Sequence, residues 1–435
     1  MYKLRIRLQQ HTPIIHFQGG QPGACLRASE VKTKLDRYLV MNFGSEFRNE
    51  SGKFIEDYFV DRQHKALDYK MRISFSRILR EEPPWKEKTN NSGKTKPYPT
   101  ISSYFAPAAE TDNSEREKKY KNVKLVVYEG VVLDLFSFCP GLVDIIKKHV
   151  PTFFAVTNFG ARSSKGFGSF SVTSIDDTPV KETGKALLKG RTYIEFQFKK
   201  NLEGNKTIVE HVYALYQVLK SGINRGPDKK GNERYEPSFL IKKYMAPKGI
   251  GSEKAFIKKH ILTEEELRRL SKRDQSFPHS EFKYVRAMLG VAPFVVFRMG
   301  RKESDEIKVR IYDESDKVKR FKSPITIKIF GNTAYFIAEK IPEAMYGREF
   351  TLTREEPAGE ESEHGEESNR AQGSGENRSI KTPSRTEFDL EDLLCSFARE
   401  ISSRKNQVDS VSVPNYQRAL KDLVKVTFVK GESIR

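Results

Sequence analysis

Cysteines are scarce in this 435-residue chain, and their spacing excludes two classes of protein. The 3 cysteines, Cys25, Cys139 and Cys395, are far apart in the sequence. They therefore form neither the paired spacing of a zinc site nor a disulfide framework, and we expect buried thiols. The 8 histidines contain no HExxH-like pairing, and no paired acids form a recognisable metal cluster. The sequence predicts a protein without a metal or another cofactor.

Long apolar segments are also absent. The most apolar stretch, residues 130–146, is interrupted by Asp134, Asp144 and a Pro-Gly pair, so it is too short to span a bilayer. The first eight residues alternate charged and apolar side chains, whereas a signal peptide has a continuous apolar segment. We expect a cytoplasmic protein with no membrane partner.

Basic residues outnumber acidic ones. Lys and Arg total 77 and Asp and Glu total 58, which gives a net charge of +19 at neutral pH. This excess favours a polyanionic ligand over a neutral metabolite, and nucleic acid is the leading candidate. Hydrophobic residues make up 37% of the chain, which is enough for a folded core, and the length favours two domains.

The first part of the chain has the element order of a β-α-β-β-α-β unit. Apolar residues alternate with Lys3, Arg5 and Arg7, which predicts a half-buried strand with a basic outer face. Apolar spacing then predicts a helix over 29–39, with Ser29 as its cap. The remaining predicted elements are strands over 70–78 and 123–138, a helix over 141–149 and a strand over 168–175. We read residues 1–177 as a ferredoxin-like domain and its insertion 81–122 as a mobile loop.

A second cycle of the same kind follows over residues 178–353. The predicted elements are a strand over 192–199, helices over 208–219, 264–272 and 281–288, and strands over 293–298, 307–312, 325–330 and 334–338. Residues 354–387 are rich in Glu, Ser, Gly and Asn, which predicts a disordered linker. Residues 388–435 form an extension with a helix over 388–401 and a strand over 424–429. The predicted fold is α+β, with two tandem ferredoxin-like domains.

Residues 157–170 combine glycines, small hydroxyl residues and cations between a predicted helix and a predicted strand. Glycines allow backbone amides to approach phosphates closely, and Arg162 and Lys165 add charge, so the segment suits an RNA backbone. A turn with ordinary solvated charges explains the same composition equally well. The segment lacks the Gly-Lys-Ser/Thr ending of a Walker loop.

Three motifs resemble those of CRISPR-associated RAMP proteins. Gly160-Ala161-Arg162-Ser163 with Lys165-Gly166-Phe167-Gly168-Ser169 resembles the glycine-rich loop of that superfamily. Thr12-Pro13-Ile14 with Cys25–Lys32 is similar to the threonine-proline strand end and basic first helix of the larger Cmr-type capping subunits of type III effectors. Phe321–Ile325 resembles the serine-proline strand entry of their second domain. Thr157-Asn158 departs from the pair of glycines that usually opens the loop.

The resemblance implies a non-catalytic subunit of an antiviral ribonucleoprotein that holds CRISPR RNA and caps or stabilises the assembly. Its expected partners are CRISPR RNA, with target RNA as a further candidate, and other effector subunits. A basic, Gly-rich loop over 221–235 adds candidates, although a flexible surface loop is an equal reading. The candidate RNA contacts are Arg27, Lys32, Lys34, Arg37, Gly160, Arg162, Ser163, Lys165, Gly166, Phe167, Gly168, Asn224, Arg225, Lys229 and Lys230.

The alternative is a metal-independent endoribonuclease that processes CRISPR RNA, because RAMP relatives include such enzymes. His11 and His16 lie beside the first predicted strand, with Lys34 and Tyr38 near them in the sequence, so an acid/base site can be imagined. We favour binding without turnover, because the glycine-rich loop ends the first domain here, whereas the processing enzymes carry theirs near the chain end.

Overall fold

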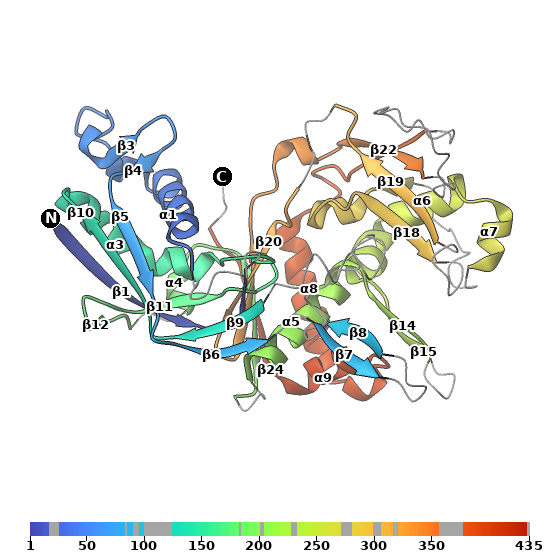
Figure 1. Cartoon of the computed structure of the whole chain (residues 1–435). Helices are drawn as coiled ribbons and strands as arrows, with labels where there is room; N and C mark the ends of the chain where they lie inside the picture. The colour runs from blue at the N-terminus through green and yellow to red at the C-terminus, as the bar shows by residue number, and fades with distance from the viewer. Residues whose placement is uncertain are drawn as a thin grey trace, which may run out of the picture. The chain divides into compact units, whose positions relative to one another are not determined.

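The computed structural model describes residues 1–16, 26–82, 85–89, 95–99, 124–181, 184–200, 204–227, 233–270, 281–298, 306–315, 318, 321–355 and 377–432. The fold is α+β, as predicted, and the chain divides into two compact units (Figure 1). The first unit contains residues 1–213, 326–337 and 421–435, and the second contains residues 214–325 and 338–420. The second part of the chain therefore returns twice to the first unit.

The first sheet has the strand order β12-β11-β1-β10-β5, and all its neighbouring strands are antiparallel. Its elements are β1 (Tyr2–Gln10), α1 (Ala28–Asn42), β5 (Lys70–Ser74), β10 (Val131–Ser137), α3 (Pro140–Val156), β11 (Phe170–Ile175) and β12 (Thr178–Pro179). Apart from the short β12, the four strands numbered along the chain lie in the order 4-1-3-2. The predicted β-α-β-β-α-β succession is present.

Alternation along β1 places Leu4, Ile6 and Leu8 in the core, and α1 and α3 pack against that face of the sheet. Helix α1 contributes its predicted apolar stripe, with Val31, Leu35 and Leu39 fully buried. Burying a side chain of this size stabilises the fold by about 1.5–3 kcal/mol. The strand period of β1 and the helical period of α1 therefore determine which face of each element is buried.

The second sheet lies in the same unit and has the order β20-β21-β13-β24. Its elements are β13 (Tyr193–Phe198), α5 (Gly204–Lys220), β20 (Ile325–Phe330), β21 (Thr333–Ala338) and β24 (Leu423–Val429). Strand β24 pairs antiparallel with β13, so the last predicted strand completes a sheet that begins more than 200 residues earlier. Numbered along the chain, its four strands again lie in the order 4-1-3-2.

Smaller elements complete the first unit. Strand β9 (Lys124–Glu129) pairs with β2 (Ile14–His16) and with β6 (Arg77–Glu82). The others are the 3-10 turns Gly44–Phe47 and Glu56–Tyr58, the pairs β3 (Phe59–Asp61) with β4 (Ala66–Leu67) and β7 (Trp85–Thr89) with β8 (Thr95–Pro99), and helix α4 (Gly184–Leu187).

The second unit contains a four-stranded antiparallel sheet of order β18-β19-β22-β23. These strands are β18 (Phe294–Arg298), β19 (Glu306–Tyr312), β22 (Glu349–Arg354) and β23 (Arg378–Lys381). Two further strand pairs are the hairpin β14 (Ile223–Pro227) with β15 (Glu233–Glu236) and the parallel pair β16 (Ile250–Ser252) with β17 (Glu281–Lys283). The α-helices that follow α5 are α6 (Glu253–His260), α7 (Glu264–Arg269), α8 (Leu390–Lys405) and α9 (Pro414–Asp422).

Several local predictions are wrong. Ser29 is not the cap of α1, because the helix begins one residue earlier and Arg27 occupies the N-cap position. The predicted helix 281–288 is strand β17 followed by a 3-10 turn over Val285–Leu289. Strands also occur in all three segments that we read as loop or linker: β7 and β8 within 81–122, β14 and β15 within 221–235, and β23 within 354–387.

Candidate nucleic-acid interface

The glycine-rich loop connects the end of α3 to β11 and has a defined backbone path. Its two ends pair, because the Phe159 amide donates to the Gly168 carbonyl at 3.0 Å and Asn158 bridges to Ser169. Its middle runs along β20, where the Ile327 amide donates to the Ser164 carbonyl at 3.2 Å and Lys165 forms a parallel bridge to Ile327. The loop is therefore anchored in the first unit at both its base and its tip.

Glycine is required by the backbone at three positions in this loop. Gly160, Gly166 and Gly168 have φ angles of +76°, +88° and +63°, in the left-handed region where side chains are disfavoured. A Cβ at Gly168 would lie 1.9 Å from the Phe159 carbonyl oxygen, and a Cβ at Gly160 would lie 2.7 Å from the Ile15 carbonyl oxygen. These glycines shape the loop through close backbone packing.

Thr12, from the threonine-proline motif, ties the loop to the end of β1. Its buried hydroxyl donates to the Gly166 carbonyl at 2.7 Å and accepts from the Ser169 amide at 2.9 Å. The neighbouring Pro13 carbonyl accepts from the Gly168 amide at 2.9 Å. The threonine-proline motif and the glycine-rich loop, which both resemble RAMP motifs, therefore contact each other directly.

Asn158 lies where the RAMP loop that this segment resembles usually has a glycine, and its side chain holds the loop. Its Nδ2 donates to the carbonyls of Ser163 and Ile327, both at 2.7 Å. Its Oδ1 accepts at 3.0 Å from Nζ of Lys328, which also donates to the Thr157 carbonyl at 2.8 Å. Lys328 is completely buried, and burial lowers its pKa well below the ordinary value.

His11 lies beside the same contacts and is held in its neutral form. Its Nδ1 accepts from the Gly331 amide at 3.1 Å, and its Nε2 lies 2.8 Å from the Ser171 hydroxyl oxygen. Burial, with the nearby charge of Lys328, lowers the pKa of His11 to about 3. Both ring nitrogens are engaged in structural contacts, so His11 is poorly suited to proton transfer at neutral pH.

Helix α1 contacts the loop through an ion pair between Lys34 and Glu30. Only Lys34 was predicted from the sequence. Lys34 Nζ lies 2.7 Å from the Glu30 carboxylate and donates to the Asn158 carbonyl at 3.0 Å. The same Glu30 carboxylate accepts from the Gly160 amide at 3.0 Å. Glu30 was missed because an acid has no obvious place in an RNA-binding face. Glu30 thus accepts the hydrogen bond of the Gly160 amide, which is one of the loop amides predicted to contact phosphate.

The other cations of the first helix have different surroundings. Lys32 turns toward its own unit: Nζ pairs with Asp36 at 2.9 Å, donates to the Leu67 carbonyl at 2.8 Å and lies 3.8 Å from the centroid of the Tyr69 ring. We therefore remove Lys32 from the candidate contacts. Arg37 is exposed, and Arg27 is half-buried at the start of the helix.

Arg162 and Lys165 lie at the turn of the loop and are both half-buried. Arg162 has a φ of +56°, so its backbone also adopts the left-handed conformation. Burial, with the charge of Arg162, lowers the pKa of Lys165 to about 8. Within the part of the chain that the structure describes, no carboxylate lies within ion-pair distance of Lys165. A bound phosphate would supply the missing negative charge.

Other predicted contacts fit less well or lie elsewhere. Phe167 is fully buried, so it belongs to the core and cannot stack on a base. Ser163 is half-buried in the loop. Asn224 and Arg225 are exposed on β14, in the second unit. Lys229 and Lys230 lie outside the described residues, as does Cys25.

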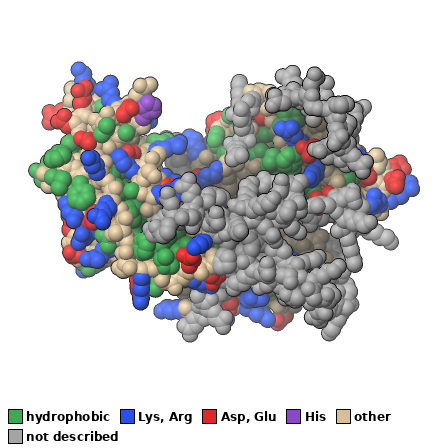
Figure 2. Space-filling view, viewed as in Figure 1, with side chains coloured by type: hydrophobic (Ala, Val, Ile, Leu, Met, Phe, Trp, Pro, Cys, Tyr) green, Lys and Arg blue, Asp and Glu red, His purple; other side chains and the backbone are tan. Residues whose placement is uncertain are grey.

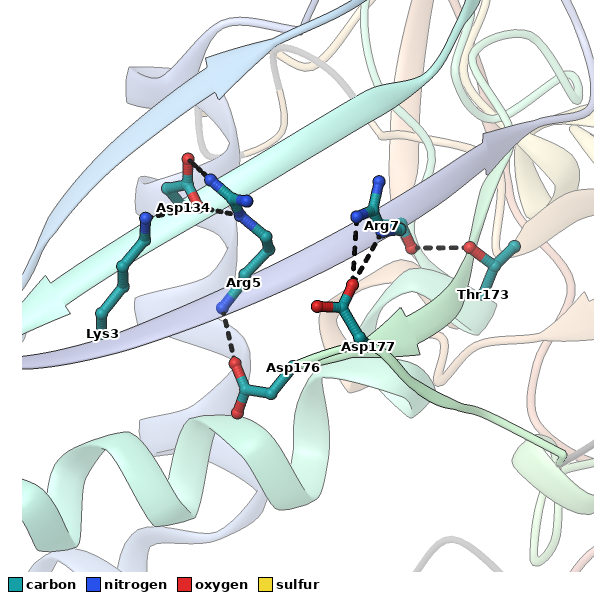
Figure 3. Close-up of polar contacts among 7 residues, drawn as sticks. All are labelled: Lys3, Arg5, Arg7, Asp134, Thr173, Asp176 and Asp177. Carbon is teal, nitrogen blue, oxygen red and sulfur yellow. Dashed lines mark hydrogen bonds and ion pairs between the residues drawn. The ribbon is translucent and has the colours of Figure 1, made fainter.

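The basic outer face of β1 is largely neutralised in the structure (Figure 3). Asp134 of β10 lies 2.9 Å from Arg5 Nε and 3.5 Å from Lys3 Nζ, and Asp177 lies 3.0 Å from Arg7 Nη2. The hydrogen bond from Arg5 lowers the pKa of Asp134. In the region of β1, Figure 2 shows acidic, basic and hydrophobic side chains intermixed. This face is a weak candidate for phosphate binding.

Among the described residues, no group of three or more His, Cys, Asp or Glu side chains is placed to hold a metal ion. Among the helices that the structure describes, none is long and apolar enough to cross a membrane.

Comparisons with known proteins identify the family. A model of the Cmr1 N-terminal domain matches residues 1–223, and a model of the Cmr1 C-terminal domain matches residues 235–422. The chain belongs to the Cmr1 family. Cmr1 proteins are RAMP subunits of the type III-B Cmr CRISPR effector complex, so the resemblance found in the sequence motifs is confirmed. The two Cmr1 domains account for most of the chain.

Solved structures similar to this Cmr1-family chain include Cmr1 from Pyrococcus furiosus in its apo form, with 11% identity, a TM-score of 0.39 and 100% of both chains covered. A chain of the type III-B Cmr-beta complex bound to cognate target RNA has 12% identity and a TM-score of 0.26, and the match covers 40% of this chain and 59% of that one. A further Cmr-beta structure has 10% identity, a TM-score of 0.35, and coverage of 77% and 94%. The comparison with curated proteins found no match.

Proposed function

We propose that this Cmr1-family chain is a non-catalytic RNA-binding subunit that holds CRISPR RNA and caps or stabilises a type III effector. Its proposed partners are CRISPR RNA, target RNA and other Cmr subunits, in the cytoplasm. The observation that carries the proposal is the anchored glycine-rich loop. It presents Arg162 and Lys165 on a backbone fixed from three sides, by Thr12, by α1 and by β20.

Preorganisation is the physical reason that this loop suits RNA. A mobile loop must lose conformational entropy when it binds, whereas the hydrogen bonds of Thr12 and Asn158 fix this loop beforehand. Phosphate contacts of Lys and Arg supply most of the sequence-independent affinity for nucleic acid. A subunit that holds RNAs with different spacer sequences needs this kind of affinity.

We further infer that both sheets of the first unit belong to ferredoxin-like domains. Apart from the short β12 of the first sheet, each has four strands in the order 4-1-3-2, with one helix after its first strand and another before its fourth. The first has the β-α-β-β-α-β succession predicted over 1–177, whereas the second takes its fourth strand, β24, from the predicted extension 388–435 and not from 178–353. In this interpretation the second domain receives two long insertions, which form most of the second unit.

The absence of turnover is part of the proposal and rests on the state of His11. A general acid or base needs a pKa near the working pH and access to the reacting atom. His11 meets neither condition, because it is buried and its pKa is about 3. Lys34, another member of the imagined acid/base set, is paired with Glu30. Of the imagined acid/base set, only His16 and Tyr38 are left for the processing-enzyme alternative.

The test removes both loop cations. Arg162→Ala/Lys165→Ala should weaken binding of a single-stranded RNA oligonucleotide about tenfold at physiological salt and lower the salt slope by about 2. Melting curves of the variant and the parent show whether the variant is folded. The matched control is Arg62→Ala/Lys65→Ala, which removes the same two residue types from an exposed turn of the first unit. Equal affinity of both double variants and the parent would show that the loop is only a structural turn.

A further inference from the structure

A cluster of aromatic and basic side chains lies on α6 and β17 in the second unit. Its rings are Phe256, His260 and Phe282, and their centroids lie 4.7 Å apart for Phe256 and His260, 6.0 Å for His260 and Phe282, and 6.1 Å for Phe256 and Phe282. His260 is exposed and the two phenylalanines are half-buried. The three rings thus form one partly open aromatic surface, which we call the α6 patch.

Two cations, Lys259 and Arg378, lie near these rings. Lys259 is exposed, and its Nζ lies 5.3 Å from the centroid of Phe282. Burial, and then the charges of Lys259 and Arg378, lower the pKa of His260. The contributions of Lys259 and Arg378, apart from that of burial, reflect positive charge near the ring.

Among the described residues, the carboxylates of Glu253 on α6 and Glu281 on β17 are both paired. Glu253 at the start of α6 is fully buried and pairs with Arg286. Glu281 of β17 lies 2.6 Å from Nζ of Lys283. Unlike the outer face of β1, where three aspartates lie among the cations, the α6 patch therefore combines exposed positive charge with aromatic surface.

We propose that the α6 patch is a second contact for single-stranded RNA, with an unpaired base stacked against His260 and Phe282 and a neighbouring phosphate bound by Lys259. The proposal rests on the proposed function, because it assumes an RNA-binding subunit. Stacking on aromatic side chains tolerates every base, and adjacent cations follow the backbone, which is the pattern of sequence-independent single-strand binding. A duplex offers no free base face, so the patch should discriminate against it.

The first test substitutes the exposed pair, Lys259→Ala/His260→Ala. The control, His64→Ala/Lys65→Ala, removes the same residue types from an exposed turn in the first unit, where His64 lies against Asp61. With a fluorescent 20-nucleotide oligouridylate as the probe, the α6 double variant should bind at least fivefold more weakly, and the control should match the parent. The affinity of a blunt RNA duplex should fall less than that of the oligouridylate.

A second variant separates stacking from charge. Phe282→Leu keeps an apolar side chain but removes the ring, and it should weaken oligouridylate binding while leaving the salt slope unchanged. Ultraviolet crosslinking of the full chain to the same probe should yield a peptide that contains Phe256, His260 or Phe282. Both measurements need no partner subunit, and melting curves show whether each variant is folded.

The outcomes distinguish this inference from the proposed function. If the parent chain binds no single-stranded RNA, both fail. If Arg162→Ala/Lys165→Ala weakens binding but the two α6 variants bind as the parent does and no crosslink maps to the patch, the second contact alone is wrong. If the α6 variants keep full RNA affinity but no longer assemble with partner subunits, the patch binds protein and the assignment to RNA is overturned.

Discussion

Thr12→Val is the substitution that most sharply tests whether the glycine-rich loop is held in one conformation. Valine has nearly the shape of threonine but cannot donate or accept a hydrogen bond. Because the Thr12 hydroxyl contacts the Gly166 carbonyl at 2.7 Å and the Ser169 amide at 2.9 Å, the change leaves two buried backbone groups without a partner.

The expected cost follows from those two contacts. An unsatisfied buried polar group costs about 1–3 kcal/mol, so the two groups left by Thr12→Val should lower the free energy of unfolding by about 2–6 kcal/mol. Thr12→Ser is the matched control, because it keeps the hydroxyl and loses only a buried methyl group, worth about 1 kcal/mol. The valine variant should therefore be clearly less stable than the serine variant, although it buries more apolar surface.

Urea unfolding followed by circular dichroism measures this difference. The midpoint should fall more for Thr12→Val than for Thr12→Ser, and single-stranded RNA affinity should fall in the same order at temperatures where both variants are folded. Equal midpoints for the two variants, or a lower midpoint for Thr12→Ser, would refute the assigned role of the hydroxyl.

Two further predictions concern pH. The pKa of Lys165 is about 8, so RNA affinity should fall as the pH rises from 7 to 9, and Lys165→Met should remove that fall; parallel pH profiles would contradict it. Since this folded-state pKa lies below the unfolded value, Lys165 should add stability as the pH rises above 8. His11, with a pKa of about 3 in the fold and an ordinary value of 6.5, takes up its proton more readily in the unfolded chain, so stability should fall as the pH drops from 6.5 toward 3. Acid unfolding of His11→Gln should depend less on pH over that range, and an unchanged dependence would contradict the neutral, buried state of His11.

Local periodicity was sufficient to predict most of the elements that build the two sheets. The alternation around Lys3, Arg5 and Arg7 gave β1, and similar patterns gave β13, β20, β21 and β24 near their observed bounds. Periodicity reports only which side chains share a face, so it could not show that β24 pairs with β13 across more than 200 residues. Strands β14 and β15 were missed because glycines and charges obscured their short alternation.

The candidate site was predicted in part for a related reason. Arg162, Lys165 and the glycines belong to one continuous segment whose composition points to phosphate. The groups that hold this segment come from elsewhere: Lys328 is 170 residues from Asn158, and Thr12 is 154 residues from Gly166. Nothing local in the sequence around Lys328 marks it as buried. On the first helix, the sequence did not show that Glu30 binds a loop amide or that Lys32 pairs with Asp36 and not with a ligand.

The α6 patch was not predicted from the sequence, because its charges look solvated and its residues are far apart along the chain. Lys259 and His260 read as ordinary solvated charges, and Phe282 lies more than 20 residues away. Strand pairing between β16 and β17 brings them together, because α6 follows β16 directly and β17 carries Phe282. A basic helix and a distant aromatic residue indicate a binding surface only when the topology places them side by side.

The most direct test of the central claim is to sequence the RNA that copurifies with the tagged chain from a host that expresses its Cmr partners. The parent chain should recover CRISPR RNA with a defined repeat-derived end, Arg162→Ala/Lys165→Ala should recover much less, and Arg62→Ala/Lys65→Ala should match the parent. Recovery of the same CRISPR RNA at parental levels by Arg162→Ala/Lys165→Ala, or of unrelated cellular RNA by the parent, would contradict the account.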